Sequence, residues 1–137
     1  MKKRQVILSL AVLCLLLAVA WCFYLYNKPH TSAAGKTTDE SLSADSLYNA
    51  YVKDEAAAGK IYMNKILEIK GVVKDVTMSD KTPVVLLNTN GDGLVNCSMA
   101  MDSAAVFSSI HKASQVIIKG KCSGYLMDVN LVDCVTK

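Results

Sequence analysis

The stretch LEIKGVVKDVTMSDKTPVVLLNTNGDGLVNCSMAM, residues 67–101, decides the fold. Leu67, Ile69 and Val73 alternate with charged or smaller residues, and this period of two predicts a long, half-buried β-strand. The Asn-Gly-Asp-Gly run that follows has two glycines able to take positive φ, which is typical of a hairpin turn. The predicted elements are a strand over 67–78, a turn over 79–83, a strand over 84–88, a hairpin turn over 90–93 and a strand over 94–101.

Downstream of this stretch the pattern predicts a short helix and another hairpin. Asp102 or Ser103 caps the helix, which runs to Ile110, and two more strands cover 115–124 and 127–135. The resulting order is three strands, a helix and two strands. In a mainly β chain of this size, that order is typical of the OB-fold, a five-stranded Greek-key barrel with a helix between its third and fourth strands.

Upstream, apolar residues recur at three- and four-residue spacing and predict a helix over 44–58, with Ser43 as its N-cap and Gly59 at its end. Residues 28–43 are rich in Ser, Thr, Gly and Ala and show no apolar period, which predicts a flexible linker. The expected domain organisation is a membrane segment over 1–27, the linker over 28–43, and the OB-fold domain with its preceding helix over 44–137.

The N-terminal segment predicts a membrane anchor. Residues 6–26 contain no charge, and as a helix they would span about 30 Å, the thickness of a bilayer's hydrocarbon core. Cations cluster at Lys2, Lys3 and Arg4, before the span. The positive-inside rule then places the N-terminus in the cytoplasm. We therefore expect a single-pass protein of the bacterial inner membrane with an extracytoplasmic C-terminal domain.

Two alternatives to the uncleaved anchor remain. Ala18-Val19-Ala20 has the small-x-small pattern of a signal-peptidase site. Cys22 could be a lipidated cysteine, although the large Trp21 before it is unlike the small residue that such processing requires. All three interpretations export the C-terminal domain.

The charge distribution argues against strong nucleic-acid binding. The net charge of +3 comes entirely from residues 1–41. Residues 42–137 contain ten lysines, ten carboxylates and no arginine, since Arg4 is the only one. The domain is therefore neutral and lacks the side chain best suited to gripping phosphates and base edges.

The domain contains Cys97, Cys122 and Cys134. An oxidising compartment permits one disulfide, which would join Cys134 either to Cys122 or to Cys97, because the third and fifth strands of an OB barrel are neighbours. The alternative is three small, buried, free thiols.

No catalytic, metal or cofactor site is expected. Asn88, Asn90 and Asp92 resemble the first half of a calcium loop, but Met99 stands where the closing glutamate should be. The cysteines have no metal-ligand spacing, and His111 stands alone beyond a helix end. No Gly-x-Ser-x-Gly elbow accompanies the serines. The sequence therefore predicts a protein that is not an enzyme and carries no cofactor.

Several short motifs resemble the bacterial tRNA-anti-like family of OB-fold domains. They are Lys70-Gly71-Val72-Val73, Val95-x-Cys97, Lys119-Gly120-Lys121-Cys122-Ser123-Gly124-Tyr125 and Asp128-Val129-x-Leu131-x-x-Cys134. The resemblance covers about residues 43–136 and includes the preceding Ala-rich helix. It implies an OB barrel, often exported, and a likeness to anticodon-binding domains that suggests nucleic acid as a ligand.

OB barrels usually bind ligands on the face of their second and third strands and in the adjoining loops. The candidate binding residues are Lys81, Asn88, Asn96, Ser98, Lys119, Lys121, Tyr125 and Asp128. We expect an envelope binding or interaction module for a protein or glycan. A nucleic-acid-binding domain and a structural component of an envelope complex are the alternatives.

The anchor interpretation makes a prediction about topology. A reporter that is active only outside the cytoplasm should be active when fused after Lys137, because the basic N-terminus stays inside. A reporter active only in the cytoplasm should be silent at the same position. The reverse pattern would contradict the export of the domain.

Overall fold

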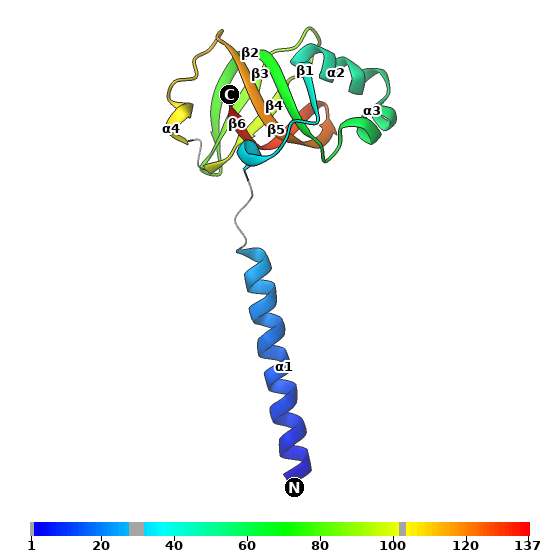
Figure 1. Cartoon of the computed structure of the whole chain (residues 1–137), viewed down its shortest axis with the longest axis vertical. Coiled ribbons are helices and arrows are strands. Elements are labelled where there is room, and N and C mark those ends of the chain that lie inside the picture. Colours follow the sequence, from blue (N-terminus) through cyan, green and yellow to red (C-terminus); the bar gives the residue numbers. More distant parts are fainter. Residues whose placement is uncertain (1, 28–31, 102–103) are drawn as a thin grey trace. The chain divides into compact units, whose positions relative to one another are not determined.

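The N-terminal unit is a single apolar helix. The computed structural model describes residues 2–27, 32–101 and 104–137, and the chain divides into two compact units, Met1–His30 and Thr31–Lys137. In the first unit, α1 runs over Lys2–Tyr26 (Figure 1). Its span Lys3–Tyr26 has a mean hydropathy of 2.9 and is long enough to cross a membrane, a property that signal sequences share.

The second unit is a closed barrel of five strands. Strands β2, β3, β4, β6 and β5 pair in that order, and β5 pairs with β2 to close the barrel. The β4–β6 pair is parallel, as in an OB-fold, and the closed five-stranded barrel confirms the predicted fold class. The elements are η1 (Ala33–Gly35), β1 (Glu40–Ser43), α2 (Ala44–Lys53), α3 (Glu55–Tyr62), β2 (Ile66–Ser79), β3 (Thr82–Leu87), β4 (Val95–Met99), α4 (Ala104–Phe107), β5 (Gln115–Leu126) and β6 (Asp128–Thr136).

The period of two in the sequence builds the core. Side chains of β3 and β4 alternate between the barrel interior and its outer surface. Leu67, Val85, Ile118 and Leu131 come from four different strands and are 0% exposed. Burial of such apolar side chains is the main source of the domain's stability.

The β2–β3 turn is tighter than the predicted turn over 79–83. Asp80 and Lys81 have positive φ, 47° and 67°, and they alone separate the strands. Two positive φ values define the hairpin turn whose twist matches that of its strands. Pro83 consequently lies within β3, paired with Met78.

The glycines at 91 and 93 have another role than the one predicted. Among the described glycines, only Gly124 has positive φ, so the run 90–93 is not the expected hairpin turn. A Cβ atom at Gly91 or Gly93 would lie 2.3 Å or 2.4 Å from the ring of Tyr48. These glycines are therefore needed because the Tyr48 ring occupies the space of their missing side chains.

The predicted helix over 44–58 is two helices. Ser43 caps α2 as predicted, and its side chain accepts a hydrogen bond from the amide of Ser46. Asp54 then adopts an extended conformation, and its carboxylate accepts from the amide of Ala57 to begin α3. Gly59 does not end the helix, because α3 continues to Tyr62.

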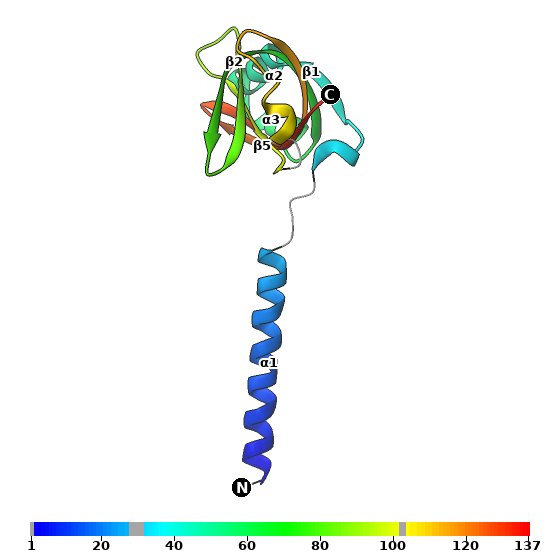
Figure 2. The ribbon, with the colours of Figure 1, turned by 90° about the vertical axis from the view of Figure 1, so that its left-hand side faces the viewer.

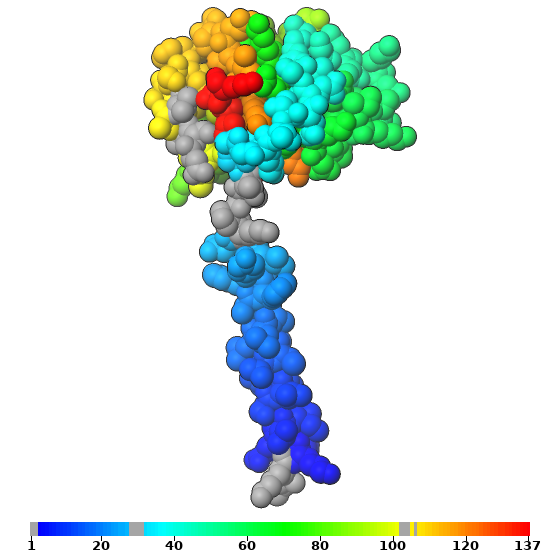
Figure 3. All heavy atoms as spheres, in the orientation of Figure 1, coloured from blue at the N-terminus to red at the C-terminus, as the bar shows by residue number. Residues whose placement is uncertain are grey.

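The predicted linker over 28–43 is also shorter than expected. Residues 28–31 lie outside the described residues, but 32–43 are part of the folded unit. Strand β1 pairs in parallel with the first half of β2, where β3 does not reach. Ala33 is 0% exposed, and this segment lies beside the C-terminal strand on the surface in Figure 3. Backbone pairing, which composition does not reveal, orders this polar stretch.

The two ends of the barrel are covered by different helices. Figures 1 and 2 show α4 at one end and α2 with α3 at the other. Helix α4 is shorter than the predicted helix that ends at Ile110, and its predicted caps, Asp102 and Ser103, lie outside the described residues. Ile110 is nevertheless buried and closes that end of the core.

The packing of Tyr48 gives a prediction about stability. Gly93→Ala should destabilise the domain by about 1–3 kcal/mol, because the added methyl group meets the Tyr48 ring and the carbonyl of Met127. Thermal unfolding followed by circular dichroism should show a melting temperature lower by at least about 5 °C. Gly35→Ala is the matched control, since nothing lies within 4 Å of its added Cβ. Equal melting temperatures for the two variants would contradict the close packing.

Candidate functional site

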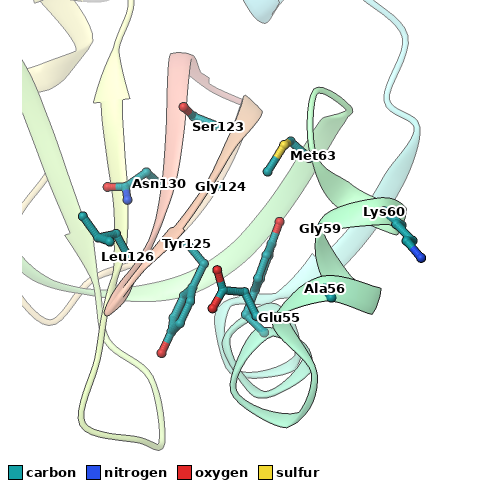
Figure 4. Close-up of a pocket in the computed structure, with 11 residues that line it drawn as sticks. Glu55, Ala56, Gly59, Lys60, Met63, Ser123, Gly124, Tyr125, Leu126 and Asn130 are labelled. Atoms are coloured by element: carbon teal, nitrogen blue, oxygen red, sulfur yellow. The ribbon is translucent and has the colours of Figure 1, made fainter.

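A pocket of the folded unit lies between α3 and the β5–β6 hairpin. Its volume is about 760 Å³, and it is open to solvent on one side. Figure 4 shows the side chains that surround it. The lining residues are Tyr51, Glu55, Ala56, Gly59, Lys60, Met63, Ser123, Gly124, Tyr125, Leu126 and Asn130.

Tyr51 and Tyr125 form a wall of this pocket, and two further tyrosines pack against them. Tyr125 stacks on Tyr51, with ring centroids 5.5 Å apart and an interplanar angle of 15°. Tyr48 meets Tyr125 edge-on at 6.3 Å, and Tyr62 packs against Tyr51 at 6.2 Å. Offset and edge-to-face contacts of this kind stabilise aromatic pairs beyond the area that they bury. The wall is therefore preorganised.

Hydrogen bonds hold the buried phenols of α2. The hydroxyl of Tyr48 accepts from the amide of Gly93 at 3.0 Å. The hydroxyl of Tyr51 lies 3.3 Å from the Cys122 thiol, inside the barrel. Burial raises the pKa of Tyr51 and, to a smaller extent, that of Tyr125. The phenols of Tyr51 and Tyr125 therefore stay neutral and are poor acid–base catalysts at ordinary pH.

The charged groups of the pocket come from α3. Glu55 lies in the first turn of α3 and points toward Tyr125 in Figure 4, whereas Lys60 points away from it. The Glu55 carboxylate adds to the rise in the pKa of both Tyr51 and Tyr125, after burial. The side of the pocket near the tyrosines is therefore the negative side.

A network of polar side chains stands next to the pocket. The Asp128 carboxylate accepts from the amide of Leu94 at 2.7 Å and from Nδ2 of Asn96 at 3.3 Å. The same Nδ2 donates to Oδ1 of Asn130, a residue that lines the pocket. Oδ1 of Asn96 is buried without a partner among the described residues. Asp128 thus joins β4 to the β5–β6 hairpin and positions the pocket rim.

The structure brings together only some of the predicted binding residues. Tyr125 lines the pocket, and Asn96 and Asp128 meet in the network beside it. The others are spread over the barrel surface: Lys81 in the β2–β3 turn, Asn88 after β3, Ser98 on β4, and Lys119 and Lys121 on β5. Lys119 donates to the carbonyl of Lys36, so it helps to hold the N-terminal segment of the folded unit.

The three cysteines of the barrel are buried free thiols. Cys97, Cys122 and Cys134 are each 0% exposed, and neither predicted disulfide is present. Cys97 and Cys134 come from the neighbouring strands β4 and β6. A hydrogen bond with Cys97, together with burial, raises the pKa of the Cys134 thiol well above its usual range. Within the described residues, no group of His, Cys, Asp or Glu side chains could hold a metal ion.

Sequence reasoning missed the helical part of the site. Tyr48 and Tyr51 fit the apolar face of the predicted helix, and Glu55 lies within the same helical pattern. The spacing of two tyrosines by one helical turn was the available signal. Their contact with Tyr125, more than seventy residues later, depends on how α2 docks on the barrel.

Comparison with known proteins identifies the family. The family model described as tRNA_anti-like matches residues 1–136, so the chain belongs to the tRNA-anti-like family. A search of curated proteins finds no match.

The chain is similar to several solved structures at low sequence identity. A candidate nucleic-acid-binding lipoprotein from Klebsiella pneumoniae is 14% identical, with a TM-score of 0.62 over 70% of this chain and 90% of that one. The Stn1–Ten1 complex of S. pombe is 12% identical, with a TM-score of 0.44 over 53% and 57% of the two chains. A candidate aspartyl-tRNA synthetase from Leishmania major is 12% identical, with a TM-score of 0.49 over 87% of this chain and 26% of that one. The first of these likenesses supports the fold alone.

The burial of the thiols predicts their reactivity. In the folded protein, Cys97, Cys122 and Cys134 should resist alkylation, because none is exposed and the raised pKa of Cys134 disfavours its thiolate. After denaturation without reductant, mass spectrometry should find all five cysteines of the chain alkylated. Cys14 and Cys22, on α1 outside the barrel, are the internal controls for complete alkylation after denaturation. Only three alkylated cysteines after denaturation would show that a disulfide exists.

Proposed function

We propose that the protein is a membrane-anchored, extracytoplasmic OB-fold module that binds a protein or glycan partner through the pocket between α3 and the β5–β6 hairpin. The observation that carries this proposal is the pocket itself, with its wall of stacked tyrosines. Binding sites are typically concave and mostly apolar, with a few polar groups that orient the ligand. Met63 and Leu126, 47% and 84% exposed, extend the apolar surface of this pocket toward solvent.

The anchor is proposed from the properties of α1. Its length and hydropathy suit a bilayer, and its cations precede the apolar span. An anchored module would present its pocket to partners in the envelope.

Nucleic acid suits this pocket less well. Non-specific binding to nucleic acid depends on neutralising phosphates, and the pocket contributes one lysine against one carboxylate. The outer surfaces of β3 and β4, where OB domains usually bind, present Val84, Leu86, Asn96 and Ser98, none of them aromatic. A barrel without stacking rings or a cationic groove on that face fits a protein or glycan partner better.

We also propose that the protein has no catalytic activity. The pocket lining includes no histidine or cysteine, and its tyrosines have raised pKa values. The hydroxyl of Ser123 has no hydrogen bond to the Glu55 carboxylate among the described residues, so the pocket presents no nucleophile paired with a base. Its groups suit recognition.

Site-specific crosslinking in cells tests the proposed function. A photo-reactive residue in place of Leu126, in the full chain, should form a discrete adduct, because this side chain stands at the pocket rim. The same residue in place of Met78, which is 61% exposed but does not line the pocket, is the control.

Filling the pocket should abolish the adduct. Ser123 is exposed and lines the pocket, so Ser123→Trp should block the partner, whereas Ser123→Ala should not. Failure to form an adduct from position 126, or an adduct that survives Ser123→Trp, would contradict the proposal. Digestion of the adduct with proteases or glycan hydrolases distinguishes a protein from a glycan.

A further inference from the structure

The carboxylate of Glu55 is available to a ligand. Glu55 is exposed and lines the pocket. Among the described residues, the ion pairs are Lys112–Asp75 and Lys137–Glu68, so Glu55 has no cationic partner within the folded unit. The other carboxylate close to Tyr125, that of Asp128, already accepts two hydrogen bonds. Glu55 is therefore the carboxylate of this pocket that remains free to bind.

The tyrosine wall next to Glu55 is electron-rich. Tyr125 is half-buried and leaves part of its surface in the pocket, while Tyr51 supports it from behind through the stacked contact. An aromatic ring attracts a cation electrostatically, and a carboxylate beside the ring attracts the same cation through a charge-assisted hydrogen bond of its own. Lys60, the other charged residue of the lining, points away from this wall (Figure 4).

The Met63 side chain forms an apolar part of the pocket floor. The methyl group of Met63 lies 3.6 Å from the position of a Cβ atom at Gly124 and 4.0 Å from one at Gly59, so it fills the gap between α3 and β5. The aliphatic stem of a long side chain could lie on this floor while its charged end reaches Glu55.

We propose that this pocket recognises an arginine side chain in an extended segment of a partner protein. The guanidinium stacks on Tyr125 and donates to the Glu55 carboxylate, and the aliphatic stem lies against Met63. Arginine fits better than lysine because its planar group can stack and pair with a carboxylate at the same time. This inference rests on the proposed function and names the chemistry of its partner.

The test uses the methionine methyl groups as reporters. The full chain in lipid nanodiscs carries six methionines, of which Met63 lines the pocket, Met78 is exposed elsewhere and Met99 is buried in the core. A pentapeptide with a central arginine, blocked at both ends, is titrated against methyl-labelled protein. The same peptide with citrulline, which keeps the shape and loses the charge, is the matched ligand.

We expect the arginine peptide to shift the Met63 signal saturably and to leave the Met78 and Met99 signals unmoved. It should bind about tenfold more tightly than the citrulline peptide, because one charge-assisted pair contributes about that factor in affinity. Glu55→Gln should remove this preference. Asp80→Asn, a charge-matched change in the β2–β3 turn outside the pocket, should keep it.

Several results would overturn the inference. They are equal binding of the two peptides, an arginine preference that survives Glu55→Gln, and a Met63 signal that responds to a single-stranded oligonucleotide but to neither peptide. Silence of Met63 toward every ligand would also reject it. If the pocket binds a partner without an arginine, these results leave the crosslinked adduct at position 126 intact. Loss of that adduct would instead reject the proposed function itself.

Discussion

The packing of Tyr48 against the barrel is the contact on which the rest of the structure depends. Its ring fills the space left by Gly91 and Gly93, and its hydroxyl accepts from the amide of Gly93. This contact fixes α2 against the end of the barrel, with Leu47 and Tyr51 buried beneath it. Because Asp54 connects α2 directly to α3, the position of α2 also sets where α3 stands. Without this contact the pocket would lack one wall.

The same tyrosines thus serve both the core and the surface. Tyr51 is 2% exposed and belongs to the hydrophobic core, yet one side of its ring supports Tyr125 at the pocket. A rigid wall reduces the ordering cost of binding, which favours affinity for a small or flexible ligand. It also means that substitution of Tyr51 would disturb folding and binding together. Residues at the rim, such as Glu55 and Ser123, separate the two effects because they are exposed.

The barrel could be predicted from the sequence because its signals are local. Alternation along β2 and β4 reports directly on which side chains face the core, and the order of strands around α4 sets the topology. The break at Asp54 and the pairing of β1 could not be predicted in the same way. The first depends on a capping carboxylate within an otherwise helical pattern, and the second on backbone bonds to β2 that composition does not encode.

The candidate site was predictable only in part, for the same reason. Tyr125, Asn96 and Asp128 come from strands and loops whose place in an OB-fold follows from the topology. Tyr48, Tyr51 and Glu55 join them because α2 and α3 pack on the barrel, through contacts between residues far apart in sequence. The predicted binding lysines show the opposite case. Their charge made them candidates, but the structure spreads them over the barrel surface, because charge in a sequence does not show which residues lie together.

The most direct test of the account is methionine footprinting in living cells. Met63 and Met78 are similarly exposed, at 47% and 61%, so brief peroxide treatment of the purified chain should oxidise both. If a partner occupies the pocket in the envelope, Met63 should be oxidised less in cells than in the purified chain, relative to Met78. In the Ser123→Trp variant, the ratio of Met63 to Met78 oxidation should be the same in cells and in the purified chain. The same ratio of Met63 to Met78 oxidation in cells and in the purified protein would contradict the claim that this pocket is the binding site.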